Sequence, residues 1–199
     1  ESHPHMVQPG MVYISMPTEF GMVYTRAELA ALYATCQKYD LRLFIDGARL
    51  GYGLVSAACD YDLPFLAKHC DVFYIGGTKV GAMMGEAVVF SGMKAPKYFF
   101  TNVKRHGALL AKGRMLGIQF DTLFTDELYF KISRHAIATA TRIRSIFEKH
   151  GITIAYDSPT NQQFVVLSPA LYEALSPKVA FEIWERKSEH EIICRFVTS

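Results

Sequence analysis

The sequence lacks an excess of charge of either sign. It contains 21 Lys and Arg residues and 19 Asp and Glu residues, which gives a formal net charge of +2. Proteins that bind nucleic acid or an anionic membrane surface by electrostatics carry a strongly basic balance or a basic patch. The composition therefore predicts no nucleic-acid partner and no membrane partner, and it favours small-molecule chemistry.

The sequence also lacks long apolar runs, a signal-peptide pattern and paired cysteines. No hydrophobic stretch approaches the roughly 20 residues of a membrane-spanning helix. The cysteines are scattered, without C-x-x-C or zinc-ligand spacing, and we interpret them as reduced thiols of a cytoplasmic protein. They are Cys36, Cys59, Cys70 and Cys194. His3 and His5 flank a proline, and we interpret them as exposed loop rather than metal ligands.

An initiator methionine is missing too. The chain begins Glu-Ser-His-Pro-His and ends on a strand-like segment, 192–197. We therefore expect it to be a piece of a longer protein.

What the sequence does contain is enough apolar material for a folded core. Half of its 199 residues are hydrophobic, which suits one ordinary domain or two small ones. In the first half, strand and helix signals alternate, and Thr25 and Glu28 match a capping box at a helix start. This alternation predicts an α/β layer with a largely parallel sheet. The expected strands are 12–15, 41–45, 71–75 and 86–90, and the expected helices are 26–40 and 63–70.

The second half has a different pattern. A mixed helical segment is expected at 96–112, and a long helix at 126–150, which Gly151 closes. One stripe of this helix is apolar and is predicted to be buried; it consists of Tyr129, Ile132, Ala136, Ala140, Ile143 and Phe147. Beyond it we expect strands at 152–154, 164–167 and 191–197 and a helix at 178–185. The predicted organisation is a large α/β domain over 1–113, connecting helices over 114–150, and a small α+β domain over 151–199.

Charged residues follow two of the predicted strands. Asp46 and Arg49 come after strand 41–45, and Lys79 comes after strand 71–75 behind two glycines and a threonine. Ligands of α/β sheets collect at the carboxyl ends of strands. A lysine and a carboxylate there suit pyridoxal 5'-phosphate (PLP), because the amine forms a Schiff base and the acid keeps the ring nitrogen protonated.

Each of these residues also has a plainer interpretation. Asp46 could cap a turn or helix, Lys79 could be a solvated surface lysine, and Arg49 could belong to a structural ion pair. Their combination at one edge of a sheet favours the cofactor site, because three charged side chains are expected to gather there.

The motif Asp46-Gly47-Ala48-Arg49, followed by a strand that ends in Gly76-Gly77-Thr78-Lys79, resembles the β-eliminating lyase/threonine aldolase family. Members of that family are fold type I PLP enzymes. The resemblance extends over nearly the whole chain. It implies the C-terminal part of the large-domain sheet, followed by a small α+β domain.

The resemblance also implies roles for single residues. Lys79 matches the Schiff-base lysine, and Asp46 matches the acid that pairs with the pyridine nitrogen. Arg49 matches an arginine near the cofactor and the substrate carboxylate, whereas Arg195 matches the small-domain arginine that holds the substrate α-carboxylate. Thr78 could bind the phosphate or order the loop.

The chain departs from the family pattern in several places. Glu19 stands where familiar threonine aldolases have a histidine near the substrate hydroxyl, and a carboxylate could serve there as the base. Leu110 stands where an arginine often reaches a neighbouring subunit's phosphate, and Lys112 could replace it. The family's phosphate-binding loop and ring-stacking histidine would precede this chain.

These observations predict a PLP-dependent carbon–carbon lyase that cleaves a β-hydroxy amino acid, such as threonine, to glycine and an aldehyde. One alternative is a PLP-dependent β-eliminating amino acid lyase. Another is a catalytically incomplete fragment that functions only with its N-terminal half. The resemblance further implies a homodimer or homotetramer.

Overall fold

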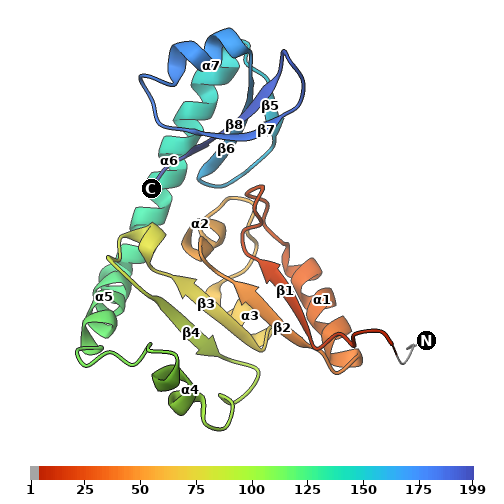
Figure 1. Cartoon of the computed structure of the whole chain (residues 1–199), viewed down its shortest axis with the longest axis vertical. Helices are drawn as coiled ribbons and strands as arrows, with labels where there is room; N and C mark the ends of the chain where they lie inside the picture. The colour runs from red at the N-terminus through yellow and green to blue at the C-terminus, as the bar shows by residue number, and fades with distance from the viewer. Residues whose placement is uncertain (1–4) are drawn as a thin grey trace.

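The computed structural model describes residues 5–199, so His3 lies outside the described part. Figure 1 shows two sheets connected by a long helix. The first sheet has the strand order β1-β2-β3-β4, in which β1 to β3 are parallel and β4 is antiparallel at the edge. Its strands are β1 (Met11–Ser15), β2 (Arg42–Asp46), β3 (Val72–Gly76) and β4 (Glu86–Phe90).

Helices cover one face of this sheet; they are α1 (Arg26–Lys38), α2 (Leu50–Leu54) and α3 (Leu63–Lys68). The capping box of α1 is confirmed, because the side chain of Thr25 accepts from the Glu28 N–H while the Glu28 carboxylate accepts from the Thr25 N–H. Leu43 and Ile45 of β2 belong to the buried core on the covered face.

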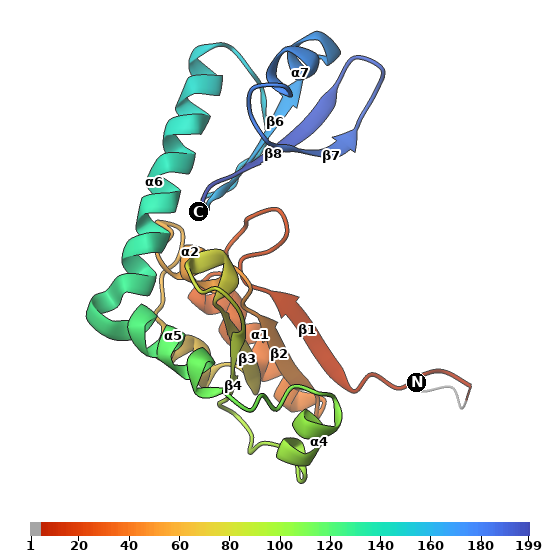
Figure 2. The same cartoon turned by 60° about the vertical axis from the view of Figure 1, so that its left-hand side comes forward.

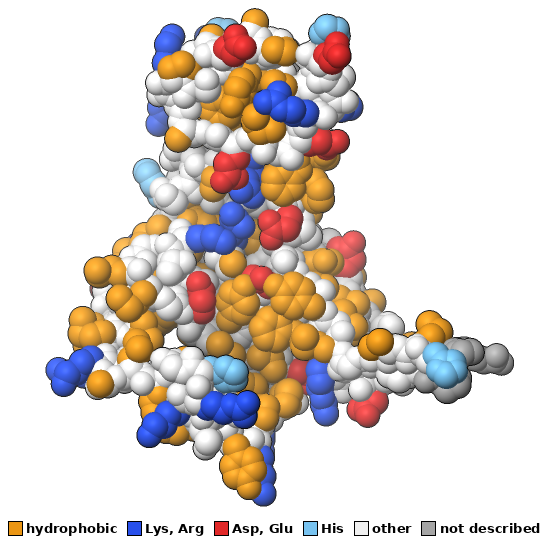
Figure 3. Space-filling view, viewed as in Figure 1, with side chains coloured by type: hydrophobic (Ala, Val, Ile, Leu, Met, Phe, Trp, Pro, Cys, Tyr) orange, Lys and Arg blue, Asp and Glu red, His pale blue; other side chains and the backbone are white. Residues whose placement is uncertain are grey.

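The opposite face of the first sheet is open. Met11 and Tyr13 of β1 are each 53% exposed, and Val88 of β4 is 51% exposed. Figure 3 shows hydrophobic side chains gathered over this sheet. Within residues 5–199, no helix packs over these strand residues in the way that α1 packs over the covered face.

The long helix α6 (Leu128–Lys149) follows α4 (Phe99–Arg105) and α5 (Arg114–Phe124) and runs alongside both sheets (Figure 2). Its predicted apolar stripe is confirmed. Tyr129 and Ala136 belong to the core under the first sheet, whereas Ile143 and Phe147 pack against the core of the second sheet. One amphipathic helix therefore packs against the cores of both sheets.

The second sheet is antiparallel, with the strand order β5-β6-β8-β7. It consists of β5 (Ile154–Tyr156), β6 (Gln162–Leu167), β7 (Glu182–Arg186) and β8 (Ile192–Val197), with the helix α7 (Pro169–Leu175) on one face. Its core contains Val165 and Cys194, which face each other across β6 and β8.

The predicted helix at 178–185 is wrong. Residues Glu182–Arg186 form β7, because they pair with β8 in the sheet. The helix lies earlier, at α7, where Ser168 caps it by accepting from the Leu171 N–H and Pro169 occupies the first turn. Serine followed by proline is a helix-start signal that the pattern of apolar residues did not reveal. The expected helix over 96–112 is also too long, since only α4 is helical there.

The cysteines were expected to be reduced thiols. All four cysteines lie in the described residues and are free thiols. Burial raises the pKa of the Cys70 thiol to about 11, which makes it a weak nucleophile. Within residues 5–199, no helix has the length and hydropathy needed to cross a membrane.

Candidate active site

Two glycines bring the ends of β2 and β3 into contact. The Gly76 N–H donates to the Gly47 carbonyl oxygen at 2.8 Å. A Cβ on Gly47 would lie 1.9 Å from the carbonyl oxygen of Tyr74, and a Cβ on Gly76 would lie 2.2 Å from that of Ala48. Neither position therefore accepts a larger residue. The two motifs that carry Asp46 and Lys79 are thereby fixed side by side.

Asp46 ends β2 as an ionised carboxylate. One oxygen accepts from the Ala48 N–H at 2.9 Å, and the other accepts from the Tyr13 hydroxyl on β1. Burial by itself would raise the pKa of Asp46, but hydrogen bonds from Tyr13, Tyr74 and Ala48, with the charge of Lys79, outweigh it and lower the pKa. This carboxylate therefore keeps its negative charge at neutral pH.

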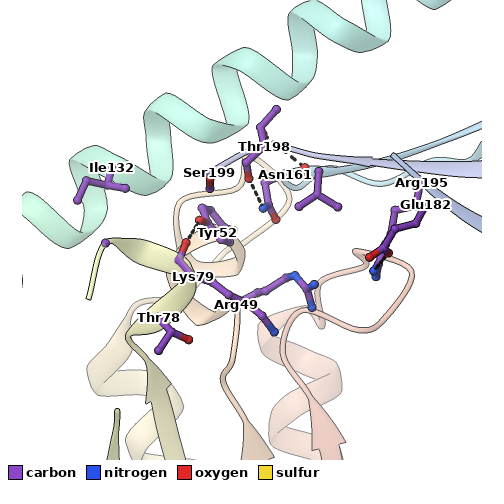
Figure 4. A pocket seen from close by; sticks show the side chains of 12 residues that line it. Arg49, Tyr52, Thr78, Lys79, Ile132, Asn161, Glu182, Arg195, Thr198 and Ser199 are labelled. Carbon is purple, nitrogen blue, oxygen red and sulfur yellow. Dashed lines mark hydrogen bonds and ion pairs between the residues drawn. The ribbon is translucent and has the colours of Figure 1, made fainter. Parts of the chain in front are cut away.

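Lys79 lies in a short turn, η1 (Thr78–Val80), directly beyond β3. The hydroxyl of Tyr52, a fully buried side chain of α2, donates to the Lys79 backbone carbonyl (Figure 4). Gly81 follows in the left-handed region, with φ +98°, and the turn ends there. Burial and the positive charge of Arg49 lower the pKa of Lys79, although nearby carboxylates oppose the shift. A lowered pKa enlarges the fraction of free amine, which is the nucleophilic form.

A pocket of about 520 Å³ lies between this edge of the first sheet and the second sheet. Figure 4 shows Lys79, Arg49 and Arg195 around the same space. Its lining also includes Tyr52, Thr78, Ile132, Asn161, Glu182 and Thr198. Asp46 is outside the lining, but its charge acts on Lys79.

The two arginines make the pocket attractive to anions. Within residues 5–199, the Arg49 guanidinium has no hydrogen bond or ion pair. Burial and the neighbouring charge of Arg195 lower the pKa of Arg49, so the two cations repel each other. A bound carboxylate would relieve that repulsion and accept hydrogen bonds from both guanidinium groups.

Glu19 is at the same edge but outside the pocket lining. It lies between β1 and α1 and is exposed. Its charge nevertheless acts on both Lys79 and Arg49.

Leu110 and Lys112 lie in the segment before α5, away from the residues that line this pocket. Asp46, Arg49 and Lys79 were predicted to lie together at the carboxyl ends of the strands, and the structure places all three there.

The residues that hold the site in place were not predicted from the sequence. Glu86 begins β4, opposite Gly76, and its carboxylate accepts from the Gly77 N–H at 2.9 Å. The Thr78 hydroxyl lies 3.5 Å from the same carboxylate, to which it donates. An acidic residue at the start of an antiparallel neighbour reaches the end of β3, but only the strand pairing reveals this.

Tyr129 was predicted only as part of the apolar stripe of α6. Its hydroxyl donates to the Gly76 carbonyl oxygen and accepts from the Gly51 N–H, both at 3.1 Å. It therefore satisfies two buried backbone groups, one beside each motif. Within residues 5–199, no group of three or more His, Cys, Asp or Glu side chains could hold a metal ion.

The chain is similar in sequence and in structure to known proteins. The family described as Beta-eliminating lyase matches residues 1–170. A low specificity L-threonine aldolase from a Pseudomonas species is 31% identical over 175 residues, which cover 87% of this chain and 51% of that protein. The solved threonine aldolase of Leishmania major is 38% identical with a TM-score of 0.96, covering 100% of this chain and 58% of that one.

More distant structures share the fold alone. A PLP-bound protein from Clostridium difficile 630, described as an aminotransferase, is 14% identical with a TM-score of 0.66 and covers 95% of this chain and 54% of that one. The α/β architecture is therefore that of PLP fold type I enzymes. The chain spans about half the length of the relatives that it matches.

Proposed function

The chain belongs to the β-eliminating lyase family, and we propose that the protein containing it is a PLP-dependent lyase that cleaves the Cα–Cβ bond of a β-hydroxy amino acid. Glycine and an aldehyde would be the products. The observation that carries this proposal is the contact between Gly47 and Gly76, which holds Asp46 and Lys79 at adjacent strand ends beside an anion-attracting pocket.

The residues present fit PLP chemically. Lys79 offers an amine of lowered pKa, and Asp46 offers a carboxylate of lowered pKa that suits a protonated ring nitrogen. Thr78 has a hydroxyl in the pocket lining that could contact the phosphate. When bound, PLP supplies an electron sink for the electrons of a broken bond at Cα.

The chain's own residues would then bind and orient the substrate. Arg49 and Arg195 would hold the α-carboxylate, because two guanidinium groups face the pocket. Lys79 would hold PLP through its Nζ amine. Glu19 would accept the proton of the substrate hydroxyl on its carboxylate as the Cα–Cβ bond breaks. Tyr52 and Tyr129 would keep the backbone of both motifs in place.

Product analysis tests this proposal. We expect the complete protein that contains this chain, loaded with PLP, to convert L-threonine to glycine and acetaldehyde. Ammonia and 2-oxobutanoate in their place would identify an eliminating lyase and overturn the carbon–carbon lyase assignment. Glu19 is the reason to keep this second candidate, since it stands where the resemblance implies a histidine.

Activity of the isolated chain is a separate question. If the isolated 199-residue polypeptide retains PLP and turns over threonine, the hypothesis of an incomplete fragment is wrong. If only a longer polypeptide is active, that hypothesis is supported. Visible absorbance of both polypeptides after incubation with PLP and removal of free cofactor makes the comparison.

Self-association is a further part of the proposal. Exposed apolar side chains lie along α5, in the segment before it and in the turn before β4; they include Met83, Leu110, Met115 and Ile118. Such a group favours an interface between copies of the protein. Light scattering during size exclusion should give a dimer or a tetramer, and a monomer would contradict this expectation.

A further inference from the structure

Arg195 on β8 is held by side chains from both neighbouring strands, β6 and β7. On one side, Nη1 donates to the Gln162 side-chain oxygen at 3.0 Å. On the other side, Nη2 donates to the Glu182 carboxylate. The guanidinium carbon also lies 5.0 Å from the centre of the Trp184 ring, in a cation–π contact. These contacts fix the position and the orientation of the Arg195 guanidinium beside the pocket.

The two hydrogen-bond partners differ in burial. Gln162 is completely buried, so loss of its contact would leave polar atoms without water or protein partners. The Glu182 side chain is 64% exposed, whereas the Arg195 side chain is only 13% exposed, so water can solvate the carboxylate when it leaves the guanidinium. The amide is therefore the fixed partner of Arg195, whereas the carboxylate is the exchangeable one.

The same amide reaches the segment between β1 and α1. Gln162 Nε2 lies 3.5 Å from the Glu19 carbonyl oxygen, to which it donates. The neighbouring Phe20 packs edge-on against Tyr156 and Trp184 of the second sheet, at centroid distances of 4.8 and 5.5 Å. A single buried side chain therefore connects the Arg195 guanidinium with the backbone of the Glu19 segment.

We propose that Gln162 is a positioning residue that holds Arg195 and the Glu19 segment in place, while Glu182 yields its place on Arg195 to the carboxylate of an amino acid ligand. This inference rests on the proposed function, because it takes Arg195 as a carboxylate-binding residue. Glu182 lines the same pocket as Arg195, so a ligand carboxylate there meets the pair directly.

Substitutions of the two partners of Arg195 should have different effects on glycine binding. Gln162→Met keeps the volume but removes the fixed partner, so glycine should bind about tenfold more weakly. Glu182→Gln removes the competing charge, so glycine should bind as tightly as in the wild type or a few-fold more tightly. Calorimetric titration of glycine into the complete, PLP-loaded protein measures both dissociation constants.

Steady-state kinetics gives a second measurement. In Gln162→Met, KM for the amino acid should rise by more than kcat falls, because binding geometry is lost first. The matched control is Gln163→Met on the same strand. Gln163 is also buried, but it donates to the Ser158 and Thr160 carbonyl oxygens and does not contact Arg195. That control should lower the melting temperature without changing the glycine dissociation constant.

A further variant covers the case in which Gln162→Met does not fold. Gln162→Glu keeps an acceptor for Arg195, whose guanidinium pairs with the added negative charge, so we expect this variant to fold. The fixed carboxylate then competes with the ligand carboxylate for Arg195, so glycine should bind at least tenfold more weakly. Equal glycine binding by wild type and folded Gln162 variants would overturn this inference alone. A wild-type protein that does not bind glycine would overturn the proposed function as well.

Discussion

The two sheets place functional side chains in different ways. In the first sheet, which is mostly parallel, Asp46 and Lys79 follow the ends of β2 and β3. In the second sheet, which is antiparallel, Arg195 lies inside β8 and its partners come from β6 and β7. A parallel sheet gathers chemistry in loops at one edge, whereas an antiparallel sheet presents it on a face.

This difference decides what a sequence can reveal. A strand-end motif is local, so its residues are read together in one short segment. A site on a face depends on register between strands that are far apart in the chain. Gln162, Glu182 and Arg195 could be placed together only after the pairing of β6, β7 and β8 was known.

The largest expected effect comes from the first sheet. Lys79→Ala removes the amine at the end of β3, so cleavage of threonine should fall by about a thousandfold or more, and the absorbance of attached PLP should disappear. Lys68→Ala, on α3 away from the pocket, is the control and should retain both. Retained absorbance in Lys79→Ala would assign the cofactor to another lysine.

A smaller effect is expected at the neighbouring strand end. Asp46→Asn removes the ionised partner of the ring nitrogen, so kcat/KM should fall by about a hundredfold. Stability gives an independent measurement. Because the folded-state pKa of Asp46 is lowered, its ionised form stabilises the protein above the unfolded pKa of about 4, and this contribution is lost as the pH falls through the folded pKa.

Denaturant unfolding of wild type and Asp46→Asn at several pH values measures that contribution. The difference in stability should be present at neutral pH and should shrink in acid. A difference that stays constant down to pH about 2 would contradict the assignment of an ionised, hydrogen-bonded carboxylate.

The contact between the two strand ends is tested next. Gly76→Ala would force a Cβ to 2.2 Å from the Ala48 carbonyl oxygen, so the protein should lose about 2 kcal/mol or more of stability. Gly117→Ala in α5, where a Cβ meets nothing within 4 Å, should instead gain about 0.5–1 kcal/mol. Thermal unfolding of both variants makes the comparison.

The smallest effect on activity is expected from a substitution in the second sheet. Arg195→Lys keeps the charge but loses the planar guanidinium, so KM for the amino acid should rise by about tenfold while PLP is retained. Arg186→Lys on β7, an exposed position, serves as the control. Loss of PLP from Arg195→Lys would show that the second sheet holds the cofactor as well as the substrate.

Much of the first sheet was predictable from the sequence. The capping box at Thr25, the strand ends at Asp46 and Lys79, and the apolar stripe of α6 all depend on local spacing. The helix predicted at 178–185 failed because β7 is stabilised by pairing with β8 rather than by its own pattern. Tyr129 was expected to be buried, but its hydrogen bonds to both motifs depend on packing between distant elements.

Lys79 is the residue that we expect to hold PLP. Borohydride reduction of the complete protein loaded with PLP, followed by peptide mass spectrometry, tests it most directly. We predict a reduced phosphopyridoxyl group on Nζ of Lys79 and on no other lysine. A modification on a different lysine, or no modified lysine at all, would contradict the assignment of Lys79.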